Sequence, residues 1–410
     1  MDATKSQKTD RAGLVVDVKI LALVGMAAIP GVAQAQEGGL GPTGVHVGAF
    51  LFEPSVTLSE VYDDNIFATD GGQEDDFITS IEPALEISSL WSRHALNFKT
   101  GIASSFYAHN SSENHTNFFA TLEGKLDITR LSNFSAKINY QKLIEARTDT
   151  NANPNAAEAT EYQRYDAGLL FTQQFNRFTL KIGGAATYFD YDDTETRSGT
   201  PIDNDARDRT DVAGTLDLGY EFSPGYSAFV RQTVDWRKYE RSVASGRDSA
   251  GYTTDFGVRL EVTRIIAAEV FGGYMVRNYD SFEDQSGFSF GANLIYDVAE
   301  GTRIQLNAGR DFQETTAIGA SGYLVSTLFA KVEHEVLRDQ VIRAQVSYTN
   351  NDYSGIDRKE DIYGGGFGYM WYFGQRISLG VNYDYQTRDS SVVDSDYARN
   401  KISLDVTLRY

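Results

Sequence analysis

The sequence of 410 residues contains no cysteine, and this absence excludes several kinds of site. Without thiols there is no disulfide framework, no Cys-ligated zinc, no iron–sulfur cluster and no thiol nucleophile. Basic residues are also few, since 37 Lys and Arg stand against 57 Asp and Glu, for a formal net charge of -20. Nucleic-acid binding needs clustered basic side chains that neutralise phosphates. The charge balance therefore argues against a nucleic-acid partner.

Long hydrophobic runs are also missing. After residue 35, no apolar stretch reaches the roughly 18 to 20 residues that a membrane-spanning helix needs. The mean hydropathy of -0.36 looks like that of a soluble protein. A transmembrane β-barrel gives a similar average, however, because only every second residue of its strands faces lipid.

The N-terminus has the pattern of a secretory signal. Basic residues precede an apolar run from Ile20 to Ile29, and Ala33-Gln34-Ala35 forms a small-x-small cleavage site. This pattern predicts a signal peptide at 1–35, followed by a short periplasmic leader at 36–51 and one mature domain at 52–410. A short buried helix is the alternative interpretation of the apolar run.

The mature chain is dominated by alternation of apolar and polar residues. From Phe77 to Ile87, for example, apolar side chains alternate with Ser80, Glu82 and Glu86. Period two places successive side chains on opposite faces of a strand. Such segments recur about 18 times between Phe52 and Tyr410. Sixteen strands remain an alternative, because the first segment and the 313–336 region alternate less regularly.

The connections between these segments alternate in length. Tight turns such as Asn176-Arg177 follow long polar loops such as Glu145 to Thr160 and Asp192 to Arg207. Outer-membrane barrels have short periplasmic turns and long outer loops. The sequence thus predicts an all-β fold, a transmembrane antiparallel up-and-down β-barrel, with both termini at the short-turn end. The two long loops named here are candidates for an inward-folding constriction.

Several motifs resemble those of a known family, putative β-barrel porin 2. They are Pro54 to Phe67, Asp76 to Ile78, Ile81 to Leu85 and Ser89 to Leu96, and the terminal Tyr410 resembles the aromatic end of many outer-membrane proteins. The resemblance covers essentially the whole mature chain. It implies a place in the outer membrane of a Gram-negative bacterium, often beside genes for exopolysaccharide synthesis and export, and it carries no catalytic motif.

The expected function is therefore a porin-like channel that takes part in exopolysaccharide export. Two alternatives stay open: a general diffusion porin for small solutes, and a structural or adhesive barrel with a closed lumen. The expected partners are outer-membrane lipid, lipopolysaccharide and the barrel-assembly machinery. The resemblance adds polysaccharide and periplasmic export components to the expected partners.

If the apolar positions face lipid, the intervening positions face the lumen, and many of these carry charge. Both signs are interspersed, so the sequence gives no clear ion selectivity. The candidate lumen-lining residues are Arg209, Asp211, Arg231, Asp235, Arg237, Asp255, Arg259, Glu261, Arg277, Arg303, Asp311, Arg343, Arg376 and Asp384.

Aromatic residues near the strand ends suggest girdles at the two membrane interfaces, where amphipathic rings are favoured. The candidates for the girdles are Tyr188, Phe189, Tyr239, Tyr279, Tyr348, Tyr353, Trp371 and Tyr372.

The sequence supports a catalytic site or a metal site less well than it supports a channel. His109 and His115 flank a loop that contains Ser111 and Ser112, and two histidines there are candidates for a base or a ligand. Exposed loop histidines are common, however, and we expect no enzyme activity and no cofactor. The long loops are rich in Asp and Glu, yet no spacing matches an EF-hand, so we expect no metal site.

Overall fold

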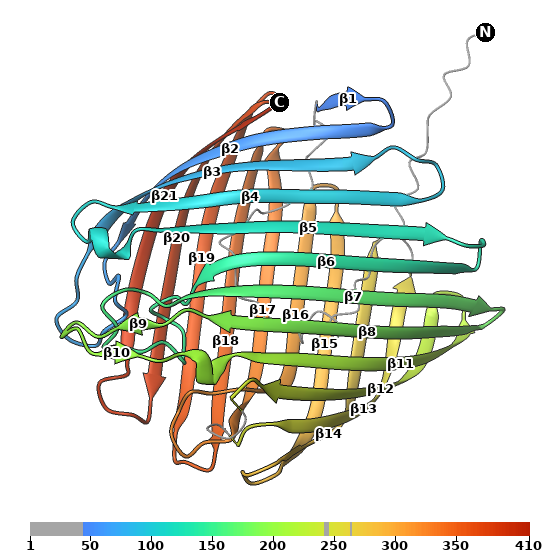
Figure 1. Cartoon of the computed structure of the whole chain (residues 1–410). Helices are drawn as coiled ribbons and strands as arrows, with labels where there is room; N and C mark the ends of the chain where they lie inside the picture. The colour runs from blue at the N-terminus through green and yellow to red at the C-terminus, as the bar shows by residue number, and fades with distance from the viewer. Residues whose placement is uncertain (1–43, 242–245, 263–264) are drawn as a thin grey trace.

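The computed structural model describes residues 44–410 except 242–245 and 263–264. Its described residues form a closed ring of 18 long antiparallel strands (Figure 1). The eighteen-strand, all-β prediction is confirmed. The ring consists of β2 (Phe50–Asp63), β3 (Asp76–Ser89), β4 (Ala95–Tyr107), β5 (His115–Asp127), β6 (Ser132–Ile144), β7 (Glu161–Phe175), β8 (Phe178–Tyr191), β11 (Arg209–Ser223), β12 (Tyr226–Tyr239), β13 (Ser249–Val262), β14 (Ile266–Tyr279), β15 (Gln285–Ala299), β16 (Thr302–Gln313), β17 (Gly322–Leu337), β18 (Gln340–Ser354), β19 (Lys359–Phe373), β20 (Ile377–Ser390) and β21 (Tyr397–Arg409).

The ring closes where its first and last strands meet. β2 pairs with its chain neighbour β3 and also with β21, in a register that runs from Ser55 opposite Arg409 to Asp63 opposite Lys401. The hydroxyls of Thr57 and Thr407 lie 3.0 Å apart across this seam. Figure 1 shows the blue N-terminal strand β2 next to the red strand β21. Closure leaves no unpaired edge among the ring strands.

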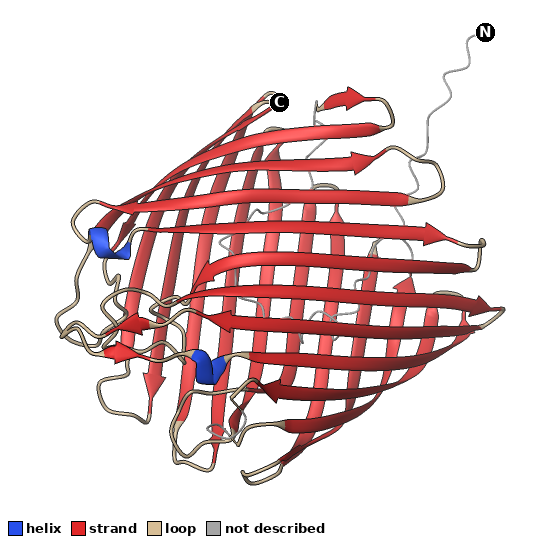
Figure 2. Ribbon diagram, viewed as in Figure 1, coloured by secondary structure: helices blue, strands red, loops and turns tan. Residues whose placement is uncertain are grey.

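The small elements lie outside the ring. β1 (Val45–Val47) forms a hairpin with β2, whereas β9 (Thr194–Glu195) and β10 (Pro201–Ile202) pair with each other inside the loop between β8 and β11. Two short 3-10 helices, η1 (Ser111–Glu113) and η2 (Asp205–Arg207), are the blue elements of Figure 2. No helix in the described residues is long and apolar enough to cross a membrane.

Two boundaries of the expected organisation can be located. β2 begins at Phe50, inside the expected leader, and β1 occupies part of the rest of that leader. The predicted signal peptide, 1–35, lies outside the described residues.

Short turns gather at one end of the barrel and long loops at the other. The turns at the short end require left-handed backbone: Asn176 has φ of 54° and Gly301 has φ of 79°. Glycine adopts this conformation at no steric cost, and asparagine tolerates it better than most residues. At the long-loop end lie the 64–75, 145–160, 192–208 and 314–321 loops, which build the site described below.

The strands present an apolar outer face and a polar inner face. Phe256 and Val346 point outward and are each 61% exposed, while Asp217, Arg231 and Asp255 are fully buried on the inner face. This arrangement inverts that of a soluble protein, in which charged side chains are almost never fully buried unless paired. The alternation seen in the sequence is therefore the alternation between the two faces of the barrel wall.

Aromatic rings line the outer face near the long-loop end. The rings of Phe118, Tyr140, Tyr165 and Tyr188 follow one another across β5 to β8, with centroids 5.8, 4.9 and 6.0 Å apart. The girdle prediction is wrong for five of its eight residues, the four inner-face rings given below and Tyr372, which lies between the outward-facing Trp371 and Phe373. Because adjacent residues of a strand point to opposite faces, Phe189 faces inward when Tyr188 faces outward. Phe189, Tyr239, Tyr279 and Tyr353 are each 3–7% exposed and belong to the inner face.

Candidate functional site

The inner wall of β11 to β14 carries a compact network of arginines and carboxylates. Asp217 accepts hydrogen bonds from Arg231 at 3.1 Å and from Arg259 at 3.0 Å. Glu269 accepts from the same two arginines, at 2.9 and 2.7 Å. The strand register explains the network, since Asp217 is the cross-strand partner of Arg231 and Glu269 that of Arg259.

Burial of these charges is tolerated because each of the two carboxylates is shared between two guanidinium groups. Phe229 adds a second contact on the same wall. Its ring centroid lies 3.8 Å from the guanidinium carbon of Arg259 and 4.8 Å from that of Arg231. A cation over an aromatic face gains electrostatic energy, more so when water is displaced. The wall is therefore rigid and charged without a large net charge.

A glycine allows a second pair to form across three strands. Arg277 of β14 donates to the carboxylate of Asp235 on β12, passing over Gly251 of the intervening strand β13. A Cβ at Gly251 would lie 2.7 Å from Asp235 Oδ1 and 2.9 Å from Arg277 Nη2. Arg277 also donates to Ser249 Oγ at 3.0 Å. Any side chain at position 251 would displace this ion pair.

Near the long-loop end, a loop residue completes the inner wall. Glu314, in the loop between β16 and β17, reaches β12 and accepts hydrogen bonds from Arg237 and from the Tyr239 hydroxyl, the latter at 2.7 Å. Arg237 also donates to the Phe312 carbonyl at 3.0 Å. Burial alone would raise the pKa of Glu314, but the Arg237, Arg209 and Arg277 guanidiniums outweigh it and hold that pKa below its usual value. The carboxylate thus fixes the 314–321 loop against the inner face of β12.

The 145–160 loop crosses the lumen. It leaves β6 and returns to β7, yet its Thr150 hydroxyl donates to Glu360 of β19 at 3.0 Å and accepts from Asn351 of β18 at 3.3 Å. β7 and β18 lie nine places apart along the ring of strands in either direction, so they are diametrically opposed. Of the two loops that are candidates for an inward-folding constriction, this one extends across the lumen.

The 314–321 loop meets the crossing loop inside the barrel. Asn151 donates to the Glu314 carbonyl at 3.3 Å and accepts from the Thr316 amide at 3.1 Å. The two loops thus support each other, one anchored on β12 and the other on β18 and β19. Side-chain hydrogen bonds, rather than a packed apolar core, make this junction.

The 192–208 loop lies over the crossing loop, and so it too contributes to the outer end. The Ala157 amide donates to the Glu195 carbonyl at 2.8 Å, and the Arg197 amide donates to the Asn155 carbonyl at 3.2 Å. Arg207 also pairs with Glu145 at the base of the crossing loop. This second candidate loop therefore covers the first rather than crossing the lumen separately.

These loops enclose a chamber of about 830 Å³ at the outer end of the barrel. Its lining comes from around the whole circumference, including the 64–75 loop, the crossing loop and the segments before β19 and β21. Six arginines line it, against three aspartates. They are Arg147, Arg197, Arg207, Arg247, Arg358 and Arg388, with Asp149, Asp203 and Asp394.

The candidate lumen-lining residues fall into distinct environments. Arg231 and Arg259 share one network, Asp235 pairs with Arg277, and Arg237 joins the 314–321 loop. Asp211, Asp235, Arg231, Arg237, Asp255, Arg259 and Arg277 are buried; Arg209, Arg303, Asp311 and Arg343 are half-buried; Glu261, Arg376 and Asp384 are exposed.

Others of these candidates lie apart from the networks. Arg303 pairs with Asp297 at 2.6 Å near the short-turn end, and Arg343 contacts Glu333 at 3.4 Å. Arg376 lies in the turn before β20, outside the strands, with its guanidinium carbon 5.2 Å from the centre of the Tyr410 ring.

The comparisons with known proteins identify the family. The family model for putative beta-barrel porin 2 matches residues 38–410. The chain belongs to this family. It is an outer-membrane, porin-like β-barrel channel, as the motifs at Pro54 to Phe67 and beyond imply, and the predicted location in the bacterial outer membrane is confirmed.

Solved barrels from Pseudomonas aeruginosa resemble this porin-family chain more distantly. OccK3 (OpdO) is 13% identical, with a TM-score of 0.45 and coverage of 87% of this chain and 96% of that one. The outer membrane protein OpdK is 9% identical, with a TM-score of 0.45 and coverage of 88% and 99%. A mutant of the ferric enterobactin receptor PfeA is 7% identical, with a TM-score of 0.45 and coverage of 88% and 80%. No curated protein matches the chain in sequence.

The porin family is one of channels, not enzymes, and the loop histidines have structural contacts. His109 Nδ1 lies 3.1 Å from a carboxylate oxygen of Asp76, and His115 Nδ1 lies 2.8 Å from the Glu113 carbonyl. Asp76 also accepts from the His109 and Asn110 backbone amides, so it orders the loop between β4 and β5.

Among the described residues of this porin, one group of acids brings carboxylate oxygens within 4.8 Å of one another: Asp193, Asp203 and Asp205. Arg241 donates to Asp203 at 2.7 Å and also to Asp205. One guanidinium therefore already binds two of the three carboxylates and offsets one of their charges.

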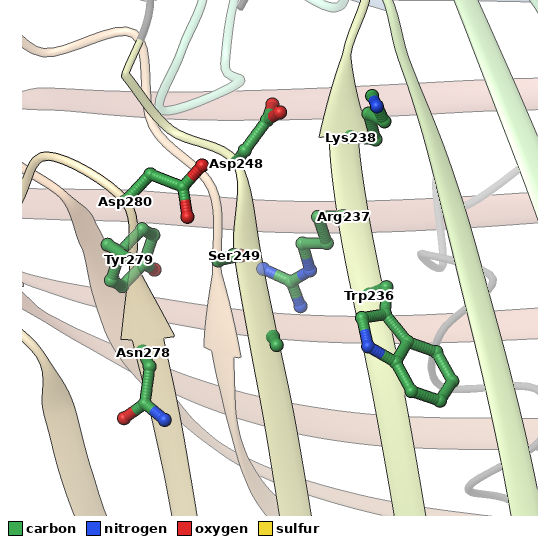
Figure 3. Close-up of a pocket in the computed structure, with 9 residues that line it drawn as sticks. Trp236, Arg237, Lys238, Asp248, Ser249, Asn278, Tyr279 and Asp280 are labelled. Atoms are coloured by element: carbon green, nitrogen blue, oxygen red, sulfur yellow. The ribbon is translucent and has the colours of Figure 1, made fainter.

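A second hollow, of about 290 Å³, lies at the outer ends of β12 to β14 (Figure 3). In Figure 3, Trp236 and Arg237 leave β12 on opposite sides, as their adjacent positions require. Trp236 and Lys238 are exposed on the outer face, and Arg237 is buried on the inner face. Asp280 joins Asp248 through a backbone hydrogen bond of 2.9 Å. This hollow lies at the rim of the porin, and its lining includes residues of both the outer and the inner face.

Proposed function

We propose that this porin-family protein is an outer-membrane channel that takes part in export of an exopolysaccharide. The observation that carries the proposal is the crossing loop, 145–160. Barrels of 16 to 18 strands are wide enough for an aqueous channel. Here that width is divided by one loop whose far end is held by the hydrogen bonds of Thr150 and Asn151. Such contacts contribute only about 0.5–3 kcal/mol each, and so the loop can leave the lumen as a unit when a polymer passes.

The family resemblance gives the proposal its substrate class. Members of the putative beta-barrel porin 2 family are often encoded beside genes for exopolysaccharide synthesis and export. A long hydrophilic chain also suits a wall that carries interspersed charges of both signs, because such a wall stays hydrated along its length.

The export role is tested by deleting the gene and measuring extracellular polysaccharide. We expect secretion to fall in the deletion strain and to return with a plasmid-borne copy. Secretion that is unchanged by the deletion overturns the export role.

Movement of the crossing loop is tested with a disulfide. The chain has no native cysteine, so T150C/N351C introduces the only thiols, at two side chains whose polar atoms are 3.3 Å apart. We expect the oxidised variant to restore secretion poorly and the reduced variant to restore it fully. Each single cysteine variant is the matched control. Equal secretion in both redox states contradicts a loop that must move.

General diffusion of small solutes is the second candidate, and the chamber of about 830 Å³ favours it, because this space is large enough for small solutes beside the crossing loop. Liposome swelling separates the two functions. A general porin admits neutral sugars at rates that fall with sugar size, and its deletion leaves polysaccharide secretion intact.

A structural barrel with a closed lumen is the third candidate. The junction between Asn151 and Thr316, where two loops meet inside the barrel, favours it. Planar-bilayer recordings of the purified protein decide the matter, since a barrel that never conducts is not a channel.

A further inference from the structure

Arginines outnumber aspartates by six to three in the lining of the outer chamber, although the protein is acidic overall. Three of its six arginines are held in ion pairs: Arg147 with Glu113 at 2.6 Å, Arg358 with Glu360 at 2.6 Å, and Arg207 with Glu145. The carboxylates of these pairs are buried, so the pairs are fixed parts of the wall. These three arginines support the chamber and leave little net charge in it.

Arg197 and Arg388 have a different environment. The guanidinium carbon of Arg197 lies 5.0 Å from the centre of the Phe67 ring, on an exposed side chain. Arg388 donates to the Ser395 carbonyl at 2.7 Å and lies 4.8 Å from the centre of the Tyr397 ring. In the described part of the chain, neither of them forms an ion pair with a carboxylate. Both keep donor groups for a ligand.

The charge of Asp149 acts on Arg388, but in the described part of the chain none of the three acids of the chamber forms an ion pair with Arg197 or Arg388. Asp203 is paired with Arg241, and Asp394 is exposed at the rim in a left-handed turn with φ of 61°. The remaining surplus of acid lies on other loops. At physiological salt, exposed charges more than about 8 Å apart are largely screened, so the acids on other loops contribute little to the potential at Arg197 and Arg388.

We propose that the outer chamber binds carboxylate groups of solutes that use the channel, with Arg197 and Arg388 as the principal ligands. A planar guanidinium presents parallel N–H donors that match the two oxygens of a carboxylate. The rings of Phe67 and Tyr397 hold these groups in place, which reduces the entropy lost on binding. The inference goes beyond the export role, because the site acts on any carboxylate-bearing solute that fits, whether or not a polymer is exported.

The test is calorimetric titration of the purified full-length barrel in detergent with trigalacturonate, an oligosaccharide that carries three carboxylates. Maltotriose is the neutral probe of similar size. We expect trigalacturonate to bind and maltotriose not to bind. In the R197Q/R388Q variant the affinity for trigalacturonate falls roughly tenfold or more, as expected for loss of charge-assisted hydrogen bonds. The single variant R197Q, at an exposed side chain, shows part of this loss.

The matched control is R93Q/R177Q, which removes two exposed arginines from the short-turn end of the same barrel. It has the same change in net charge, and its affinity for trigalacturonate stays at the wild-type value. Absence of binding to the wild-type barrel overturns the proposal, and so does an equal loss in the chamber and control variants. Calorimetry does not measure polysaccharide secretion, so absence of carboxylate binding does not contradict the export role. Unchanged secretion in the deletion strain likewise does not contradict carboxylate binding.

Discussion

At the scale of single residues, Glu314 decides whether the 314–321 loop stays on the wall. E314Q keeps the shape of the side chain but removes the charge that Arg237 and Tyr239 contact. We expect the loop's attachment to weaken by about 1.5–3 kcal/mol, the range for hydrogen bonds to charged groups. Single-channel recordings of E314Q then show larger and noisier currents.

Its control is E283Q in the exposed 280–284 loop, which leaves the current unchanged. Identical currents in E314Q and wild type would show that this carboxylate does not restrain the loop.

Asp149 gives the chamber a pH dependence. Enclosure by the surrounding loops and the nearby Glu145 carboxylate raise the pKa of Asp149 to about 6, despite opposing effects of Arg207 and Arg388. Lowering the pH from 7 to 5 therefore removes a negative charge from the chamber. We expect the reversal potential in a KCl gradient to shift toward anion selectivity over this interval.

D149N abolishes the shift in reversal potential, and a D149N barrel with the wild-type pH profile contradicts the assignment to Asp149.

The same raised pKa makes the stability of the folded barrel depend on pH. The folded state binds the extra proton between about pH 4 and 6, so this group's contribution to the free energy of unfolding falls as the pH rises through that window.

At the scale of elements, the two faces of each strand differ in how well they tolerate a charged substitution. Val346 is 61% exposed on the outer face of β18, and the adjacent Ser347 faces inward. We expect V346R to destabilise the barrel by about 2–4 kcal/mol, as for arginine near the bilayer midplane. S347R, one residue away, changes conductance instead. Urea titration in phospholipid vesicles measures the free energy of unfolding of both variants. Equal losses of stability contradict the assignment of the two faces.

Sequence periodicity specifies these elements well but not every side chain on them. Alternation predicts the strands because one face of each strand meets lipid and the other meets water. The girdle error at Phe189 came from using position near a strand end alone, although Tyr188 and Phe189 cannot point the same way. The two-residue strands β9 and β10 are too short to leave a periodic signal.

The sequence could identify the 145–160 loop as a candidate constriction but could not predict which strands it contacts. Its length was visible, whereas its contacts join residues 210 positions apart, as Thr150 and Glu360 do. Such contacts depend on the curvature of the closed ring, which local patterns do not encode. The role of Glu314 was missed for the same reason, because one acid in a polar loop has no distinguishing sequence signal.

At the scale of the whole molecule, closure of the ring is the condition for folding. Removing β21 leaves the edges of β2 and β20 unpaired, and unpaired backbone groups are too costly in lipid. We expect a chain ended after residue 396 to fail to assemble and to lose the heat-dependent gel mobility of a folded barrel.

Deletion of 44–48 is the control, because it removes β1, which pairs with β2 alone and lies outside the ring. That deletion leaves assembly intact. A folded, membrane-inserted barrel without β21 would falsify the seam described between β2 and β21.

The crossing loop also has a mechanical consequence. A ring built from strands joined side by side bends most easily along the lines between strands, so a wide barrel can flatten toward an ellipse. The 145–160 loop joins β6 and β7 to β18 and β19 on the opposite side. It therefore acts as a cross-tie that limits ovalisation of the outer rim. Lateral pressure from the bilayer on one side of the barrel is transmitted through this loop to the opposite side. Breaking the hydrogen bonds of the loop makes the whole outer rim easier to deform.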